Sequence, residues 1–135
     1  VDKALGYDIG SFNSVATDKW VGTLEDEPVL LSDPIDAFTF DFSNFEKIYK
    51  ETKTIKVGVN RAGSCAGVIQ WMKVKLYDDI EYQNNPVEMY RSNSVSGWKT
   101  PIFTFSGPVN LTKGQSLNIK ATLTEDYSWF HLDSP

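Results

Sequence analysis

The stretch GVIQWMKVKL, residues Gly67–Leu76, decides the fold class of this chain. Its second half alternates apolar and charged side chains, with Met72, Val74 and Leu76 separated by two lysines. A period of two is typical of a β-strand with one buried face. The first half is apolar on both faces except at Gln70, which predicts one continuous strand in the centre of a sheet.

The same alternation recurs in three other runs, at Phe38–Phe42, Ile55–Val59 and Leu117–Leu123. Each run predicts a strand with one apolar face and one more polar face. Turn-forming residues separate the runs. The sequence Ser106–Pro108, for example, predicts a turn before a short strand at Val109–Leu111. This alternation is the pattern of an antiparallel sheet packed on one side.

Helical patterning is scarce in comparison. Ser43–Lys50 predicts one turn or a short helix, capped by Ser43 or Asn44. The polar stretch Asn84–Gly97 predicts a long surface loop. Several short strands with little helix predict an all-β fold, namely a single antiparallel β-barrel or sandwich-like domain.

The length of 135 residues suits one domain. Because 41% of the residues are hydrophobic and 23% charged, the composition is that of a folded domain and not of a disordered chain. We expect a loop-rich arm or N-terminal segment over residues 1–28 and the barrel core over residues 29–135. The chain does not begin with Met, and we expect it to be a piece of a longer protein.

The charge distribution limits the kinds of partner that we expect the chain to bind. The formal net charge is −5, and the 13 basic residues are scattered among 18 acidic ones. Nucleic-acid binding needs clustered Lys and Arg, so we expect no nucleic-acid partner. No apolar run reaches the roughly 18 to 20 residues of a membrane span, so we expect no membrane partner either. An acidic surface suits a basic partner such as an Arg-rich peptide.

Residues that could perform catalysis or hold a metal are sparse. Cys65 and His131 are the sole cysteine and histidine, and together they are too few for a zinc site. A single thiol forms no internal disulfide, which favours a reducing, intracellular compartment, cytoplasm or nucleus. The acidic pairs at Asp78–Asp79, Glu25–Glu27 and Glu125–Asp126 fall in apparent turns, where solvated carboxylates are common.

The sequence also shows no motif that would bind a dinucleotide or a methyl donor. Such a site needs a glycine-rich turn between a strand and a helix, and the chain has no βαβ pattern. The sequence therefore predicts no catalytic, cofactor-binding or metal-binding residue in this chain.

The order of the motifs resembles the C-terminal β-barrel of the protein arginine methyltransferases. The resemblance covers nearly the whole chain, although each motif alone is weak. The segments that carry it are Tyr7–Asn13, Leu30–Phe38, Gly67–Leu76, Ser96–Phe103 and Val109–Leu117.

This resemblance implies a non-catalytic half of a two-part enzyme. The barrel is expected to pack on an N-terminal S-adenosylmethionine-binding domain of the same polypeptide and to form one wall of the groove for a protein or peptide substrate. Dimerisation through an arm near residues 14–28 is a further expectation. The full enzyme would methylate a nitrogen of its substrate, whereas the isolated chain is expected to be inactive and to bind no donor.

The resemblance also implies the site residues. Ser96, Gly97 and Trp98 stand where the family has a Thr-His-Trp motif beside the active site. These three are the expected substrate-binding residues, with Trp98 the main contributor. Ser96 and Gly97 replace the threonine and the histidine, so a side chain that could hydrogen-bond in the active site is missing.

Two other functions remain open. A free-standing β-sandwich could bind a protein or a carbohydrate, and a carbohydrate site would place two or three aromatic rings in one exposed plane. A small ligand-binding barrel would need an apolar cavity. The bulky Phe38, Phe40 and Phe42 predict a filled interior instead. The positions of the four tryptophans would discriminate among these functions.

Overall fold

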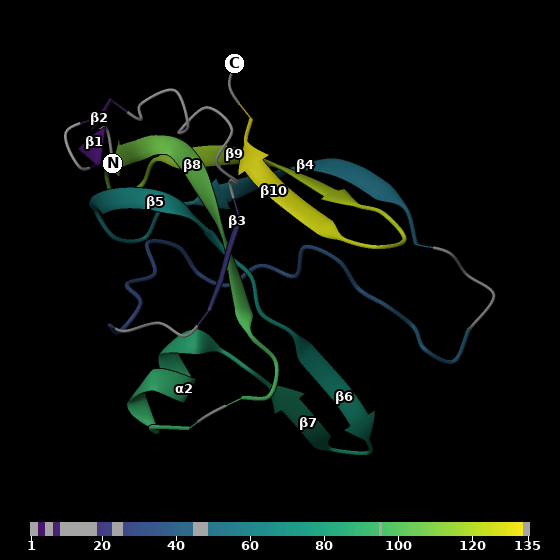
Figure 1. Cartoon of the computed structure of the whole chain (residues 1–135). Helices are drawn as coiled ribbons and strands as arrows, with labels where there is room; N and C mark the ends of the chain where they lie inside the picture. The colour runs from purple at the N-terminus through teal and green to yellow at the C-terminus, as the bar shows by residue number, and fades with distance from the viewer. Residues whose placement is uncertain are drawn as a thin grey trace.

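The computed structural model describes residues 3–4, 7–8, 19–22, 26–44, 49–94 and 96–133, with side chains from residue 26 onward. Within these residues the chain is all-β with little helix, as predicted (Figure 1). The elements, in chain order, are β1 (Lys3–Ala4), β2 (Tyr7–Asp8), β3 (Lys19–Gly22), β4 (Glu51–Gly58), β5 (Gly63–Ile69), β6 (Lys73–Tyr77), β7 (Ile80–Gln83), α2 (Pro86–Arg91), β8 (Thr100–Leu111), β9 (Ser116–Leu123) and β10 (Ser128–Leu132).

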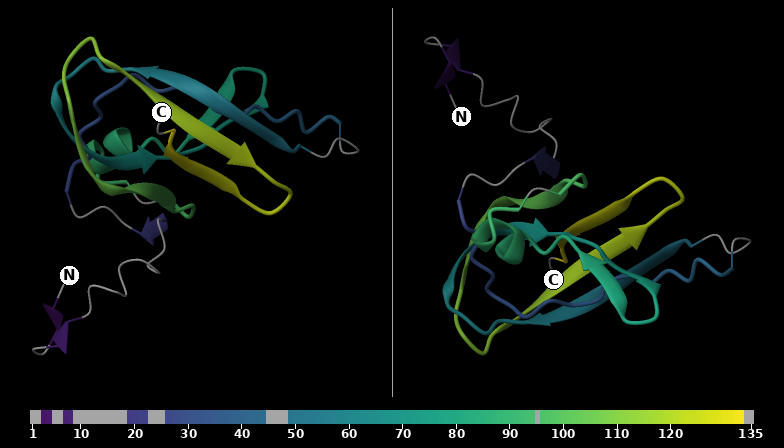
Figure 2. Two further views of the ribbon diagram at one scale, coloured as in Figure 1. Left: turned by 90° about the horizontal axis from the view of Figure 1, so that it is seen from above. Right: turned by 90° about the horizontal axis from the view of Figure 1, so that it is seen from below.

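The strands form antiparallel ladders. One three-stranded sheet has the order β10-β9-β4, a second has the order β3-β8-β5, and β6-β7 and β1-β2 are two-stranded hairpins. β10 lies against β8, so the two larger sheets meet there (Figure 2). Among the described strands the ladders stay separate and form no closed barrel, so the sandwich-like alternative describes them better than the barrel.

The β4–β9 ladder confirms two of the predicted strands. Ile55 pairs with Ile119 and Thr54 with Lys120, so apolar residues lie opposite apolar ones and polar residues opposite polar ones. Ile119 and Ala121 are buried, whereas Thr54 and Lys120 are exposed. The period of two in the sequence therefore separates a core face from a solvent face.

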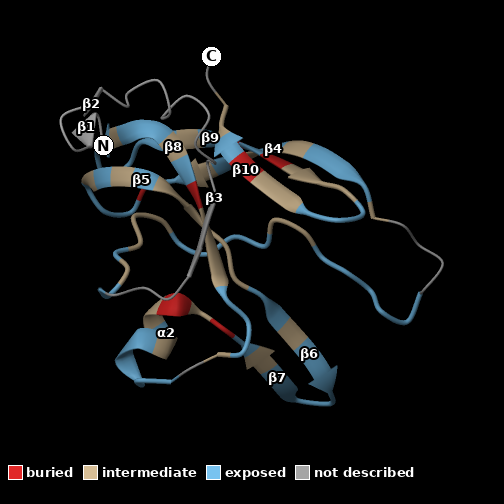
Figure 3. Cartoon of the chain, viewed as in Figure 1, coloured by how far each residue is buried: buried red, intermediate tan, exposed pale blue. Residues whose placement is uncertain are grey.

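The core lies between the two larger sheets. It is formed by Phe103 of β8 with Ile119, Ala121 and Phe130 of β9 and β10. Phe103 is fully buried, and its ring lies 5.1 Å from that of Phe130 in an edge-to-face arrangement. Figure 3 shows buried residues where these strands meet, and a second small group between β7 and α2. Burial of aromatic rings of this kind is what joins the sheets.

The expected turn at Ser106–Pro108 is a wide bulge inside β8. Cys65 pairs with Val109 and Gly67 with Thr104, so four residues of β8 lie opposite one residue of β5. Pro108 has no N–H to give to a ladder, which is tolerated at a bulge. The turn prediction was wrong because Gly and Pro also mark bulges.

The predicted continuous strand Gly67–Leu76 is two strands. β5 ends at Ile69 and β6 begins at Lys73. In between, Gln70 N donates to the Pro101 carbonyl over 2.9 Å, and the chain then leaves β8 for the β6–β7 hairpin. β5 is also an edge of its described sheet, with β8 in the centre, so the prediction of a central strand was wrong. Its apolar residues reflect packing on the core, which Val68 joins.

The run Phe38–Phe42 forms no strand. Phe38 packs on Phe130 with ring centroids 5.9 Å apart, but Phe40 and Phe42 are exposed, so the prediction that all three fill an interior was wrong. Alternation alone cannot make a strand without a neighbour to pair with. The helix or turn expected at Ser43–Lys50 falls partly on residues 45–48, which lie outside the described residues.

Candidate functional site

Ser96 and Trp98 lie in the segment that joins α2 to β8. The structure brings both against Tyr82 of β7, a residue that no sequence pattern singled out. The hairpin β6–β7 and the helix α2 lie below the two larger sheets in the view of Figure 1. The expected site is therefore carried by this smaller lobe.

Two hydroxyl groups hold the segment before Trp98 in place. The Tyr82 hydroxyl and the Ser96 Oγ lie 2.7 Å apart in a half-buried hydrogen bond. The Ser96 Oγ also accepts a hydrogen bond of 3.0 Å from the backbone N–H of Trp98, which closes a local turn. The Ser96 hydroxyl therefore positions the backbone just before Trp98.

The Trp98 indole rests on the Tyr82 ring. The centroids are 5.3 Å apart and the planes meet at 72°, an edge-to-face contact that is favourable for aromatic pairs. The Trp98 side chain remains 55% exposed. A large aromatic surface is thus held on one side by protein and open to solvent on the other.

Asn84 fixes the backbone beneath this pair. It is 2% exposed and the only buried polar residue of the described part of the chain. Its Oδ1 accepts from Met72 N over 2.8 Å, and its Nδ2 donates to the Trp98 carbonyl over 3.2 Å. Its own backbone N–H donates to the Met72 carbonyl. One amide therefore ties together the start of β6, the end of β7 and the entry to β8.

The predicted loop Asn84–Gly97 contains the helix α2. Asn85 caps it, with Oδ1 accepting from Val87 N over 3.0 Å, and Pro86 opens the first turn. Glu88 in the first turn and Arg91 in the last complement the helix dipole. These start and stop signals were readable in the sequence, but six residues are too short for a helical period to show.

The hairpin presents one apolar face. Val74 pairs with Tyr82, and a register shift at Leu76 lets Tyr77 pair with Ile80. Because the shift changes the alternation, Tyr77 joins the face of Tyr82. Tyr77 is 80% exposed and Ile80 60%. The opposite face carries charges, among them the Lys73–Glu81 ion pair at 3.2 Å.

Gly97 is exposed, and its backbone does not require glycine. A Cβ built there meets nothing within 4 Å, and the residue is not among those with positive φ. A Cβ therefore has room at this position, where the resemblance leads one to expect a histidine.

The other candidate residues lie elsewhere. Cys65 Sγ donates to the Gly67 carbonyl over 3.4 Å, and His131 is exposed on β10. Asp78–Asp79 and Glu125–Asp126 lie in exposed turns, as predicted. Glu25 lies outside the described residues. Within the described ranges no group of three His, Cys, Asp or Glu side chains could hold a metal ion.

The described residues of the site offer an aromatic face and hydroxyl groups to a partner. They include no arrangement of catalytic groups. The indole face of Trp98 can receive a planar or cationic group, and the Tyr82–Ser96 pair offers hydroxyls for a hydrogen bond. Neither hydroxyl has a described base beside it that would make it a nucleophile.

No protein-family model matches the chain, and a search of curated proteins finds no match either. Of the helices within the described ranges, none has the length and apolar character needed to cross a membrane.

Proposed function

We propose that this chain is the accessory β-domain of an S-adenosylmethionine-dependent protein methyltransferase of the arginine type. It contributes one wall of the protein-substrate groove and is inactive by itself. The donor-binding domain of the same polypeptide supplies the cofactor site and the chemistry. The proposal places the protein inside the cell, in keeping with its single, unpaired cysteine.

One observation carries the proposal. Trp98, the residue of the Thr-His-Trp motif that the chain retains, is exposed although its backbone and one edge of its ring are held by Asn84 and Tyr82. An aromatic residue that is preorganised and open to solvent suits a partner, because little side-chain entropy is lost on binding. The order of the sequence motifs supports the family assignment.

The contacts around Trp98 suggest a role in substrate binding for each residue of the site. Trp98 offers its indole face to the substrate chain, and a guanidinium group stacks well on such a face. Ser96 and Tyr82 position Trp98 through the hydroxyl pair and the ring contact. Gly97 stands where the family has a histidine, and a Cβ built there meets nothing within 4 Å beyond its chain neighbours.

A carbohydrate-binding sandwich is less well supported. Of the three tryptophans whose side chains the structure describes, Trp71 and Trp129 are half-buried, and Trp129 packs edge-on against Phe103 at 5.3 Å. Trp98 alone of these three is exposed. The described tryptophans therefore form no planar platform of several rings.

The test is a two-dimensional NMR titration of the ¹⁵N-labelled chain with S-adenosylmethionine and, separately, with a glycine–arginine repeat peptide. The donor is expected to shift no resonance. The peptide is expected to shift the Trp98 indole N–H and the amides around Tyr82 and Ser96.

A matched pair of variants sharpens this test. Trp98→Ala is expected to weaken peptide binding about tenfold or more, as for a central aromatic contact. Tyr127→Ala removes an aromatic of nearly equal exposure, 54%, from the β9–β10 turn and is expected to change nothing. Stoichiometric donor binding, or peptide shifts that bypass Trp98, would overturn the proposal.

A further inference from the structure

The negative charge of the chain is concentrated in one segment. Residues 26–44, here called the acidic segment, contain Asp26, Glu27, Asp33, Asp36 and Asp41 and no Lys or Arg. The remaining residues hold 13 basic and 13 acidic side chains, so the whole formal charge of −5 lies in these 19 residues. Such a segment dominates the long-range potential of a small domain.

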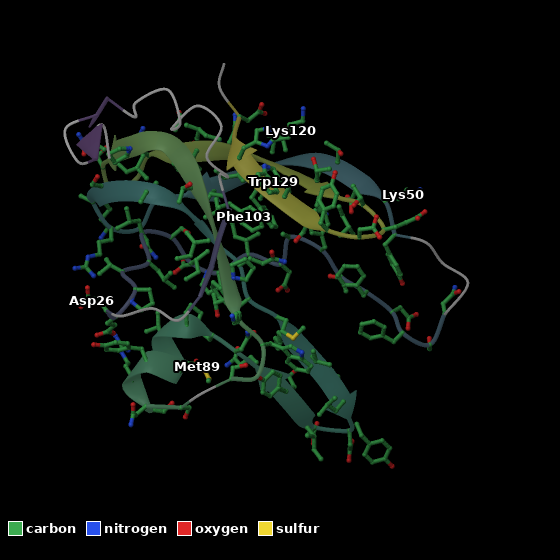
Figure 4. All side chains as sticks on the ribbon, viewed as in Figure 1. Asp26, Lys50, Met89, Phe103, Lys120 and Trp129 are labelled. Carbon is green, nitrogen blue, oxygen red and sulfur yellow. The ribbon has the colours of Figure 1, made fainter. Side chains whose placement is uncertain are left out.

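The acidic segment is an extended ribbon on the outside of the sheets. It crosses the molecule beneath them in Figure 1, and Figure 4 labels Asp26, its first residue, and Lys50, which follows it in the chain, on opposite sides of the view. All of residues 33–36 and 39–44 are exposed. The only ladder contact that the structure describes for the segment is the single bridge between Ser32 and Val59.

Apolar side chains on this ribbon face solvent. Phe42 is 68% exposed, Ile35 47% and Phe40 43%. The rings of Phe40 and Phe42 stack at 6.4 Å with planes 17° apart. Exposed aromatics that cluster in this way mark interaction sites more often than isolated ones do.

The acidic segment is held against the sheets by hydrogen bonds and by one core side chain. Asn60 donates from its backbone to the Leu31 carbonyl over 2.9 Å and from Nδ2 to Asp33 Oδ1 over 2.8 Å. Phe38 packs into the core. The position of the acidic segment is therefore restrained before a partner binds. This restraint lowers the entropy lost on binding.

We propose that the acidic segment is a docking surface for a second protein, which contacts it through an extended segment that alternates Lys or Arg with apolar residues. The partner's apolar side chains cover Ile35, Phe40 and Phe42, and its cations meet Asp33 and Asp36. Charge complementarity favours this partner, since the acidic segment combines exposed aromatic side chains with carboxylates and itself contains no Lys or Arg. Of its carboxylates, Glu27 is already paired with Arg91. The surface shares no residue with the Trp98 site, and this proposal does not rest on the function proposed for that site.

The experiment is a fluorescence anisotropy titration of the chain into a fluorescein-labelled peptide of about nine residues that alternates arginine and leucine. Binding is expected to weaken about tenfold or more between low and high salt, because exposed charges are screened. An aspartate–leucine peptide of the same length is expected not to bind.

Three variants locate the surface. The first, Phe40→Ser with Phe42→Ser, and the second, Asp33→Asn with Asp36→Asn, are each expected to weaken binding about tenfold. The Asn side chain at position 33 keeps an oxygen for Asn60, so the fold contact is retained. The control, Asp126→Asn with Tyr127→Ser, removes an exposed acid and an exposed aromatic from the β9–β10 turn and should bind as the wild type does.

Binding that is equal in the three variants, or an aspartate–leucine peptide that binds as well, would overturn this docking surface. The Trp98→Ala variant separates the two proposals. If it abolishes binding of the arginine–leucine peptide while the acidic-segment variants retain it, the docking surface fails and the Trp98 site stands.

Discussion

Asn84 and Trp98 are joined by a hydrogen bond of 3.2 Å from the Asn84 Nδ2 to the Trp98 carbonyl. The donor is buried and the acceptor residue carries an exposed indole. The same amide also accepts from Met72 N, so an interior contact determines where an exterior ring lies. The stability of the fold and the geometry of the candidate site are thereby coupled through one side chain.

Replacing Asn84 with Ala should destabilise the chain by about 1–3 kcal/mol, because the Met72 N–H and the Trp98 carbonyl lose their side-chain partner. Urea unfolding followed by tryptophan fluorescence measures this change. Asn110→Ala, at an exposed position of β8, is the control and should lie within about 0.5 kcal/mol of the wild type. Equal effects at the two positions would mean that the Asn84 contacts add nothing to stability.

The hydroxyl pair can be tested by a double-mutant cycle of Tyr82→Phe and Ser96→Ala. Both changes keep most of the packing, and Tyr82→Phe retains the ring beneath Trp98. Each single change is expected to cost about 0.5–1.5 kcal/mol, with a coupling energy of at least about 0.5 kcal/mol between them. Strict additivity in thermal unfolding would show that the 2.7 Å contact is energetically silent.

Gly67 makes a close approach that the sequence could not reveal. A Cβ there would lie 2.2 Å from the Phe103 carbonyl oxygen, which is backbone and cannot swing away. Gly67→Ala is expected to lower the free energy of unfolding by about 1–3 kcal/mol through overpacking. Gly107→Ala, where a Cβ meets nothing within 4 Å, is the matched control and should have a midpoint close to that of the wild type. A tolerated Gly67→Ala would contradict the β5–β8 register.

Gly97→His should leave stability within about 0.5 kcal/mol of the wild type, because the position is open and exposed. Differential scanning calorimetry measures it. The NMR titration with the glycine–arginine peptide then reports whether the added imidazole extends the shifted region around Trp98. An unfolded or strongly destabilised variant would show that the segment before β8 is more constrained than its exposure indicates.

The sequence predicted strands best where a run of alternating apolar and polar residues also pairs with a neighbouring strand. Ile55–Val59 and Leu117–Leu123 each alternate, and β4 and β9 pair along their whole length. Phe38–Phe42 alternates equally well but has no ladder, because strand formation depends on a neighbour that a local pattern does not name. Local pattern therefore predicted the fold class but not every strand.

The candidate site was predicted only in part. Trp98 and Ser96 were selected by resemblance, and the structure places them together. Tyr82 and Asn84 were missed, since each is 14 residues from the partner that its side chain contacts. No local spacing rule covers contacts of that range. The helix α2 was missed for a different reason, because its capping signals surround only six residues.

The most direct test of the central proposal is to read the coding sequence upstream of Val1. The account predicts a donor-binding α/β domain there, with a glycine-rich turn between strand and helix and a pair of glutamates to clamp the substrate nitrogen. A start codon immediately before Val1 would contradict it. The chain would then stand alone, and a partner-binding β-domain would be the better description.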